Sequence, residues 1–139
     1  MAVARYLADT SALTRLARPA VRERLRPLIE RGLIATCGPV VLEMLYATRA
    51  REDYQRLRGF LADLETLTVD DEVFDRAVQV QELLSERGRL RQVGVADLLI
   101  AATAEASRVI VLHYDADFDA VAELTGQPTE WVTPRGTVP

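Results

Sequence analysis

Short apolar runs alternate with longer segments of helical periodicity along most of the chain. The clearest run is Val109-Ile110-Val111-Leu112, which is continuous and largely β-branched, as in a parallel sheet covered on both faces. Other short apolar runs have the length and the flanking turn residues of strands. The predicted strands cover residues 3–8, 33–36, 67–69, 109–112 and 130–132.

Segments with apolar residues at helical spacing separate these strands. Pro19 and Pro39 suit first helical turns, Gly32 suits a helix end, and Asp70 or Asp71 suits an N-cap. The predicted helices end near residues 16, 31, 49, 64, 87, 106 and 125.

This alternation predicts an α/β fold with a central parallel sheet of about four to five strands flanked by helices. We expect one domain over residues 1–133 and a loose tail over residues 134–139. The single Cys37 excludes an intrachain disulfide, and no apolar run reaches the roughly 20 residues needed to cross a bilayer. Because no secretory signal is visible, we expect a cytoplasmic protein without membrane attachment.

All 17 basic residues are arginine, and with 21 acidic residues the net charge is −4. The absence of lysine disfavours a P-loop, a Schiff-base enzyme and phosphate sites built on a lysine. The negative net charge does not exclude a nucleic-acid substrate, because acids can gather in one cleft while arginines surround it.

Asp97 is the one carboxylate in the apolar helical stretch from Gly94 to Ala104. None of the residues three or four positions from it carries a compensating charge. An isolated ionised carboxylate among apolar side chains is strongly unfavourable. Asp97 is therefore either an N-cap satisfied by backbone donors or an acid neutralised by a cation from outside the helix.

Four other acids also lack a basic partner close in sequence or follow a predicted strand. Glu43 has no basic neighbour at helical spacing, Asp9 directly follows the first strand, and Asp115 and Asp117 follow the fourth. Each also suits an ordinary structural role, as a helix cap or a first-turn acid. Because parallel strands end at one edge of a sheet, we expect these acids to meet there with Asp97. Such a cluster of oxygen ligands suits Mg²⁺ or Mn²⁺.

Other metal sites fit less well. One histidine and one cysteine cannot build a typical zinc site. The spacing of Asp115, Asp117 and Asp119 resembles the start of an EF-hand, but Ala120 replaces its glycine and Gly126 replaces its glutamate. The same three aspartates match the haloacid-type nucleophile motif poorly.

Four acidic segments follow one another at residues 9–13, 41–49, 95–104 and 112–119. In order and spacing they resemble the acidic motifs of PIN domains, and most of all those of VapC toxins of type II toxin–antitoxin modules. The resemblance extends over about residues 3–132. It implies a PIN-like domain, a metal-dependent endoribonuclease acting on RNA, a homodimer, and a small VapB-like antitoxin that blocks the site.

The resemblance also implies a set of metal ligands for one or two Mg²⁺ ions, with Mn²⁺ as a substitute; Asp119 is placed outside it. A divalent cation at such a site lowers the pKa of a bound water and stabilises charge on the scissile phosphate during in-line attack. Hydrolysis by water then leaves a 5′-phosphate and a 3′-hydroxyl. The implied catalytic and metal-binding residues are Asp9, Glu43, Asp97, and Asp115 or Asp117.

Several neighbouring residues are candidates for supporting roles. Thr10 or Ser11 is expected to support a carboxylate or a water. Arg89 and Arg91, in the loop before the Asp97 helix, are candidates to contact RNA phosphates, with a solvated loop as the alternative. His113 is expected at a strand end, facing the rim of the cleft or the solvent.

The face formed by Tyr54, Leu57, Phe60 and Leu61 is expected to lie partly in the core and partly open to an amphipathic antitoxin segment. Two other classes use similar acids: a non-catalytic PIN-like module that binds protein or RNA, and a DNA-directed flap or repair nuclease. The intact acid set disfavours the first class. The short chain, without room for clamps or helical arches, disfavours the second.

Overall fold

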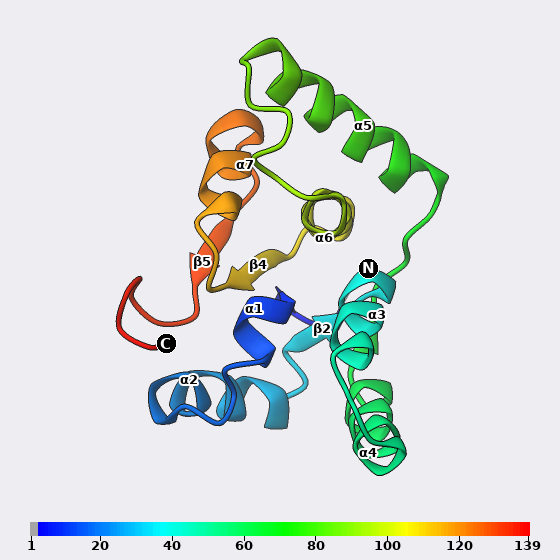
Figure 1. Cartoon of the computed structure of the whole chain (residues 1–139), viewed down its shortest axis with the longest axis vertical. Helices are drawn as coiled ribbons and strands as arrows, with labels where there is room; N and C mark the ends of the chain where they lie inside the picture. The colour runs from blue at the N-terminus through cyan, green and yellow to red at the C-terminus, as the bar shows by residue number, and fades with distance from the viewer. Residues whose placement is uncertain (1–2) are drawn as a thin grey trace.

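A parallel sheet of five strands forms the centre of the computed structural model, which describes residues 3–139 (Figure 1). The strand order is β3-β2-β1-β4-β5, and every neighbouring pair is parallel. The predicted α/β fold with a flanked parallel sheet is confirmed. The strands are β1 (Tyr6–Ala8), β2 (Ile34–Thr36), β3 (Glu65–Thr66), β4 (Ile110–His113) and β5 (Thr129–Trp131).

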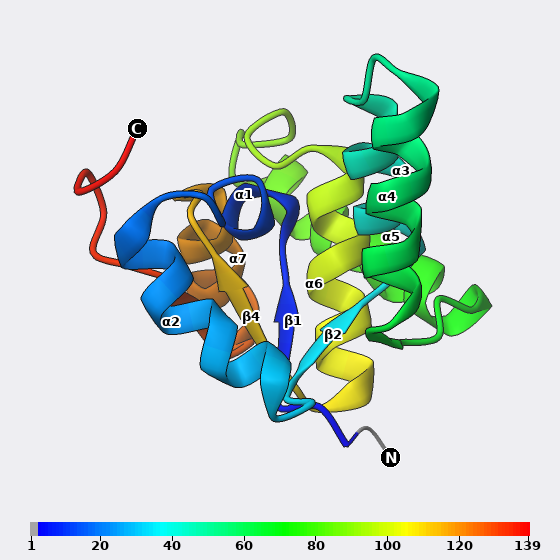
Figure 2. The same ribbon diagram turned by 90° about the horizontal axis from the view of Figure 1, so that it is seen from below.

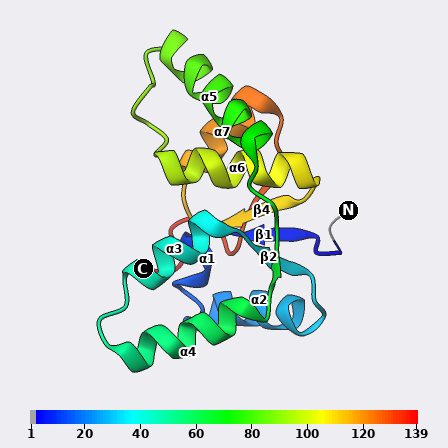
Figure 3. The same cartoon turned by 90° about the vertical axis from the view of Figure 1, so that its right-hand side faces the viewer.

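Helices cover both faces of the sheet. Figure 3 shows α5, α6 and α7 on one side of the strands and α2 and α4 on the other. Seen from below, β1 lies between α2 and α6 (Figure 2). Within residues 3–139 the helices are α1 (Thr10–Leu13), α2 (Pro19–Glu30), α3 (Gly38–Tyr46), α4 (Arg51–Ala62), α5 (Asp71–Glu86), α6 (Val95–Ser107) and α7 (Asp117–Thr125).

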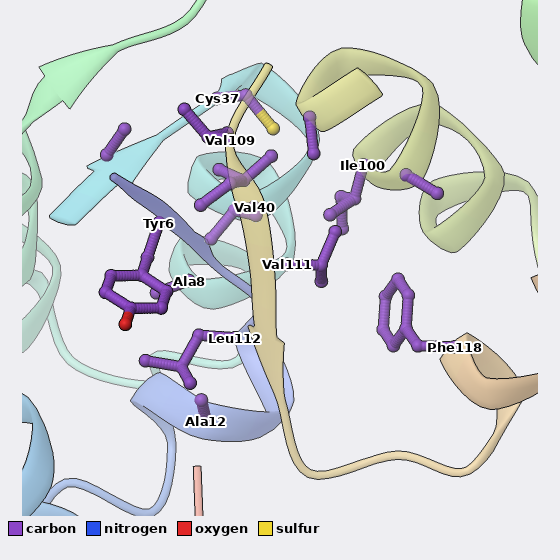
Figure 4. Packing of buried hydrophobic residues seen from close by; sticks show 14 of the residues in the cluster. Tyr6, Ala8, Ala12, Cys37, Val40, Ile100, Val109, Val111, Leu112 and Phe118 are labelled. Atoms are coloured by element: carbon purple, nitrogen blue, oxygen red, sulfur yellow. The ribbon is translucent and has the colours of Figure 1, made fainter. Parts of the chain in front are cut away.

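The two faces of β4 pack against different helices because successive strand side chains point in opposite directions. Val111 points toward Ile100 of α6 and Phe118 of α7, whereas Leu112 lies on the other side with Ala12 of α1 (Figure 4). Each of these side chains is at most 1% exposed. A strand buried on both faces explains why residues 109–112 are apolar without alternation.

Helix α6 is the most deeply enclosed of the helices. It packs against α3, α5, α7, β1 and β4, and its residues from Leu98 to Ala104 are largely buried. An apolar helix with no polar face is stable only in such an interior position. The first turn of α6, which carries Asp97, is thereby fixed relative to the carboxyl ends of β1 and β4.

The third strand differs from its prediction at residues 67–69. It pairs through Glu65 and Thr66, with Ala35 and Thr36 opposite. Leu67 is buried, and its backbone N–H still donates to the Thr36 carbonyl. The apolar run at residues 67–69 therefore indicated buried residues next to the strand and not the paired residues themselves.

The α4 face is partly buried in the core, as predicted, whereas its contact with an antitoxin segment stays a prediction. Leu61 is buried, Leu57 and Phe60 are half-buried against the core, and Tyr54 is 44% exposed. The division of the chain at residue 133 stays a prediction, although Val138 is in contact with Tyr114 in the folded chain. No helix in residues 3–139 combines the length and apolar character needed to span a bilayer.

Candidate metal centre

Five acidic side chains converge where β1 and β4 end. Asp9 follows the last residue of β1, and Asp115 and Asp117 follow β4. Asp97 in the first turn of α6 and Glu43 in the second turn of α3, rather than the first turn considered from the sequence, join them there. In open α/β folds this edge, at the carboxyl ends of the strands, is the usual place for a ligand.

The carboxylates form two overlapping groups. Oxygens of Asp9, Glu43 and Asp97 lie within 4.8 Å of one another, and so do oxygens of Asp97, Asp115 and Asp117. Asp97 therefore joins the aspartate after β1 to the pair after β4. Asp9 is buried, Glu43 is exposed, and the other three are half-buried. Each of the five acids named from the sequence belongs to the cluster.

Asp97 is not a helix cap. Gly94 is the N-cap of α6, so Asp97 lies in the first turn rather than at the cap position. Burial, followed by repulsion from Asp9 and then from Asp115, Glu43 and Asp117, raises the pKa of Asp97 to about 7. Of the two explanations given for this acid, the helix cap is wrong. The other explanation, that the Asp97 charge is neutralised from outside the helix, is consistent with the burial of Asp97 and the carboxylates around it.

Asp9 is held in place through one of its carboxylate oxygens. Oδ2 accepts hydrogen bonds from the Ser11 backbone N–H at 2.9 Å and from the Ser11 hydroxyl, so Asp9 is the N-cap of α1. Burial raises the pKa of Asp9 even though these hydrogen bonds act in the opposite direction. Its other oxygen, Oδ1, is buried and has no hydrogen-bond partner within residues 3–139.

An unpaired buried carboxylate oxygen is uncommon, since burying an acceptor without a partner costs about 1–3 kcal/mol. The Asp9 carboxylate lies in a cluster with other carboxylates. Within residues 3–139 no arginine forms an ion pair with any acid of this cluster. An oxygen-rich, electron-rich site of this kind fits a hard divalent cation. The residues present thus match the metal site inferred from the sequence.

Thr10 and Ser11 contact the acids as expected. The Thr10 hydroxyl donates to Glu43 Oε1 at 2.9 Å, which orients the most exposed carboxylate of the cluster. Ser11 Oγ donates to Asp9 and accepts the backbone N–H of Tyr114 at 2.8 Å. Ser11 therefore joins the end of β1 to the segment after β4.

The last residue of β4 is more buried than the sequence analysis predicted. His113 is fully buried against Phe118 and Trp131, rather than facing the rim or the solvent. Burial lowers its pKa to about 4, so the ring is neutral, and Nδ1 accepts the Asp115 backbone N–H at 3.1 Å. Its polar character gave no signal of this burial, which depends on the aromatic side chain contributed by β5.

Asp115 and Asp117 are arranged as a small turn. Asp115 Oδ1 accepts the Asp117 backbone N–H at 2.9 Å, and burial and then repulsion from Asp115 raise the pKa of Asp117. Asp119 accepts the Trp131 indole N–H and belongs to neither of the two carboxylate groups within residues 3–139. Both Asp115 and Asp117 lie close enough to Asp97 to share a cation with it.

Arg89 and Arg91 lie in the loop between α5 and α6. Arg89 is half-buried, donates to Gln92 and lies 3.9 Å from a carboxylate oxygen of Glu123. Arg91 is exposed. Within residues 3–139 neither arginine forms an ion pair with the acidic cluster. Their contact with RNA stays a prediction.

Comparison with known families agrees with the fold and the acids. The sequence profile of the PIN domain family matches residues 6–124, a span that includes all five clustered acids. The chain belongs to the PIN-domain family.

Among curated proteins the chain is similar to VapC ribonucleases. It is 48% identical to ribonuclease VapC21 of Mycobacterium tuberculosis over 96% of this chain and 97% of the relative. It also matches a solved VapBC structure from Salmonella typhimurium with a TM-score of 0.77 at 20% identity, covering 94% of this chain and all of the other. VapBC-5 from M. tuberculosis is matched with a TM-score of 0.61 at 26% identity, over 94% and 99% of the two chains.

The raised pKa of Asp97 has a consequence for stability. Between about pH 4 and pH 7 the folded chain holds a proton on Asp97 that the unfolded chain has released, so the stability of the metal-free protein falls as pH rises. Asn cannot ionise. We therefore expect D97N to have a higher melting temperature than the wild type in EDTA at pH 8, with the difference shrinking toward pH 4.

Thermal unfolding followed by circular dichroism checks this, with D75N, at an exposed acid on α5, as the control. Saturating Mg²⁺ should raise the melting temperature of the wild type and of D75N more than that of D97N. A metal-free D97N that is less stable than the wild type at pH 8 would mean that Asp97 is satisfied by a protein donor.

Proposed function

We propose that this chain is the toxin of a type II toxin–antitoxin module and acts as a divalent-cation-dependent endoribonuclease. The observation that carries the proposal is the convergence of five carboxylates, one with a buried and unpaired oxygen, at the carboxyl edge of a parallel sheet. The extended similarity to proteins named VapC ribonucleases supports RNA as the substrate.

Mg²⁺ is the proposed cofactor, with Mn²⁺ as a substitute, because the cluster offers only carboxylate oxygens. Asp9 and Asp97 would hold it together with Glu43 and with Asp115 or Asp117. When bound, the cation would activate a water and stabilise negative charge on the phosphate, which leads to 5′-phosphate and 3′-hydroxyl ends.

The chain's own residues prepare the site for this chemistry. Ser11 fixes Asp9 through two hydrogen bonds, so that its free oxygen has one orientation. Thr10 orients Glu43 in the same way. Burial of the Asp97 carboxylate keeps its charge incompletely solvated, so that a cation gains more from pairing with it than with an exposed acid. Arg89 and Arg91 are proposed contacts to the RNA backbone at the far end of this edge.

The proposed inhibitory partner is a VapB-like antitoxin. An apolar groove of about 410 Å³ lies between α1, α3 and α4 and is lined by Leu16, Met44, Leu57 and Phe60, among others. A groove of this composition suits the apolar face of an amphipathic helix. Its lining includes Met44, the residue after Glu43 on α3, and we propose that a segment bound there extends over the acidic cluster. The cytoplasm is the proposed compartment, since antitoxin and RNA are both found there.

The homodimer implied by the resemblance has a surface that suits it. Eight large apolar side chains are exposed in residues 3–139, and five of them lie on α3, α5 and the first residue of α6. We propose that a second copy of the chain covers this apolar face. Its members are Leu42, Tyr46, Phe74, Val78 and Val95.

Ribonuclease activity is tested by incubating total RNA with purified, antitoxin-free protein in Mg²⁺, Mn²⁺ or EDTA. We expect cleavage with either cation, none in EDTA, and a loss to background in D97N, because that acid is common to both carboxylate groups. D75N should cleave like the wild type. Mapping of the fragment ends should find 5′-phosphates.

Equal cleavage by wild type and D97N, or cleavage that persists in EDTA, would contradict the proposed site. Folded wild-type protein that cuts no RNA with either cation would instead favour the non-catalytic PIN-like module.

The proposed dimer face is tested by light scattering after gel filtration. The double variant Y46E/V78E places two charges in the apolar face and should elute as a monomer, whereas the wild type has twice the mass of the chain. L90E is the matched control, since Leu90 is exposed but lies in the loop before α6. A variant that dimerises as well as the wild type would place the interface elsewhere.

A further inference from the structure

Two aromatic side chains form a wall beside the acidic cluster. Tyr114 directly follows β4, and Trp131 is the last residue of β5. Their rings meet edge to face with centroids 5.4 Å apart. The Trp131 indole is fixed further by its hydrogen bond to Asp119 and by its contact with His113. The wall is thus a fixed part of the sheet edge that carries the acids.

An arginine lies against each of these rings. The guanidinium carbon of Arg15 is 4.7 Å from the centroid of Tyr114, and that of Arg135 is 5.8 Å from the centroid of Trp131. Both distances are in the range of cation–π contacts. We call these four residues, Arg15, Tyr114, Trp131 and Arg135, the arginine–aromatic wall.

The two arginines of this wall have no acidic side chain as an ion-pair partner within residues 3–139. Arg15 donates to the Ser11 carbonyl oxygen and to an oxygen of Pro139, the last residue of the printed sequence, and no Asp or Glu side chain of residues 3–139 pairs with Arg15 or Arg135. Arg89, in the loop before α6, differs because it lies 3.9 Å from a Glu123 carboxylate oxygen and donates to Gln92. A guanidinium that stacks by its face keeps donors at its edge for a phosphate.

The chain after β5 holds Arg135 near the site. The Val132 backbone N–H donates to the His113 carbonyl at 2.8 Å, and six residues later Val138 is bound to Tyr114. The Tyr114 hydroxyl donates to the Val138 carbonyl at 2.9 Å and accepts its N–H at 3.1 Å. Arg135 lies in the turn between these two anchors, and Figure 1 shows this segment curving back toward α1.

The wall is adjacent to the proposed metal ligands. Ser11 bonds both to Asp9 and to the Tyr114 backbone, and Arg15 is one turn of chain beyond Ser11. The five clustered acids repel a polyanion, so an RNA strand that reaches them needs cationic contacts alongside. On the β5 side no Asp or Glu side chain of residues 3–139 pairs with either guanidinium group.

We propose that Arg15 and Arg135 bind consecutive phosphates of the single-stranded RNA on the β5 side of the acidic cluster, with Tyr114 and Trp131 holding the two guanidinium groups in place. The inference rests on the proposed ribonuclease function and specifies where its substrate lies. The RNA strand then runs along the carboxyl edge of the sheet, from this wall past Asp9 and Asp97.

The test compares R15Q/R135Q with the wild type for binding of a fluorescein-labelled single-stranded RNA, followed by anisotropy in EDTA to prevent cleavage. Loss of two phosphate contacts should weaken binding about tenfold at low salt and reduce the slope of log K against log salt by about 1.4. R135Q alone, at an exposed side chain, should lower the slope by about half as much.

The control is R31Q/R58Q, which removes the same charge from two exposed arginines, Arg31 at the end of α2 and Arg58 on α4. This variant should bind RNA with an affinity and a salt slope near those of the wild type. In cleavage assays with Mg²⁺, R15Q/R135Q should raise KM with little change in kcat. If the wild type cleaves RNA and R15Q/R135Q binds RNA with the same salt dependence as the wild type, this inference is overturned and the ribonuclease function stands. Wild-type protein that neither binds nor cleaves RNA would overturn both.

Discussion

The repulsion among carboxylates gathered at the edge of the sheet is the constraint on which the rest of this structure depends. Ionised acids within 4.8 Å of one another destabilise the folded chain unless a proton or a cation intervenes. Burial first, and this repulsion second, raise the pKa of Asp97 to about 7. The fold must therefore hold the acids together against their own charge. A divalent cation converts this unfavourable arrangement into a favourable one.

The hydrophobic core supplies the force that opposes the repulsion. Helix α6 is buried along most of its length, and β4 is buried on both faces, so neither can move away from the cluster without exposing apolar surface. Polar supports act locally: Ser11 holds Asp9, Thr10 holds Glu43, and the neutral His113 ring holds the backbone at Asp115. Rigid placement before the cation binds is what a metal site needs.

Much of this arrangement could be predicted from the sequence, because burial and helical spacing leave a clear pattern. The apolar run at residues 109–112 and the lone acid of the apolar stretch 94–104 identified the sheet and the cluster. The parts that could not be predicted depend on contacts between distant segments. The third strand pairs at Glu65 and Thr66 rather than at the apolar residues 67–69. His113 is buried against Phe118 and Trp131, and Arg135 meets Trp131, through contacts that form only in the folded chain. A single sequence contains no periodicity that reports such contacts.

The most direct test of the central idea, that these acids together hold a divalent cation, is a crystal of the protein grown with Mn²⁺ and measured at the manganese absorption edge. The predicted result is an anomalous peak bonded to carboxylate oxygens of Asp9 and Asp97, with Asp115 or Asp117 completing the contacts. Crystals at saturating Mn²⁺ with no peak at this edge of the sheet, and with the Asp97 carboxyl hydrogen-bonded to a neighbouring acid, would contradict it. In that case a shared proton, rather than a metal, would be what stabilises the cluster.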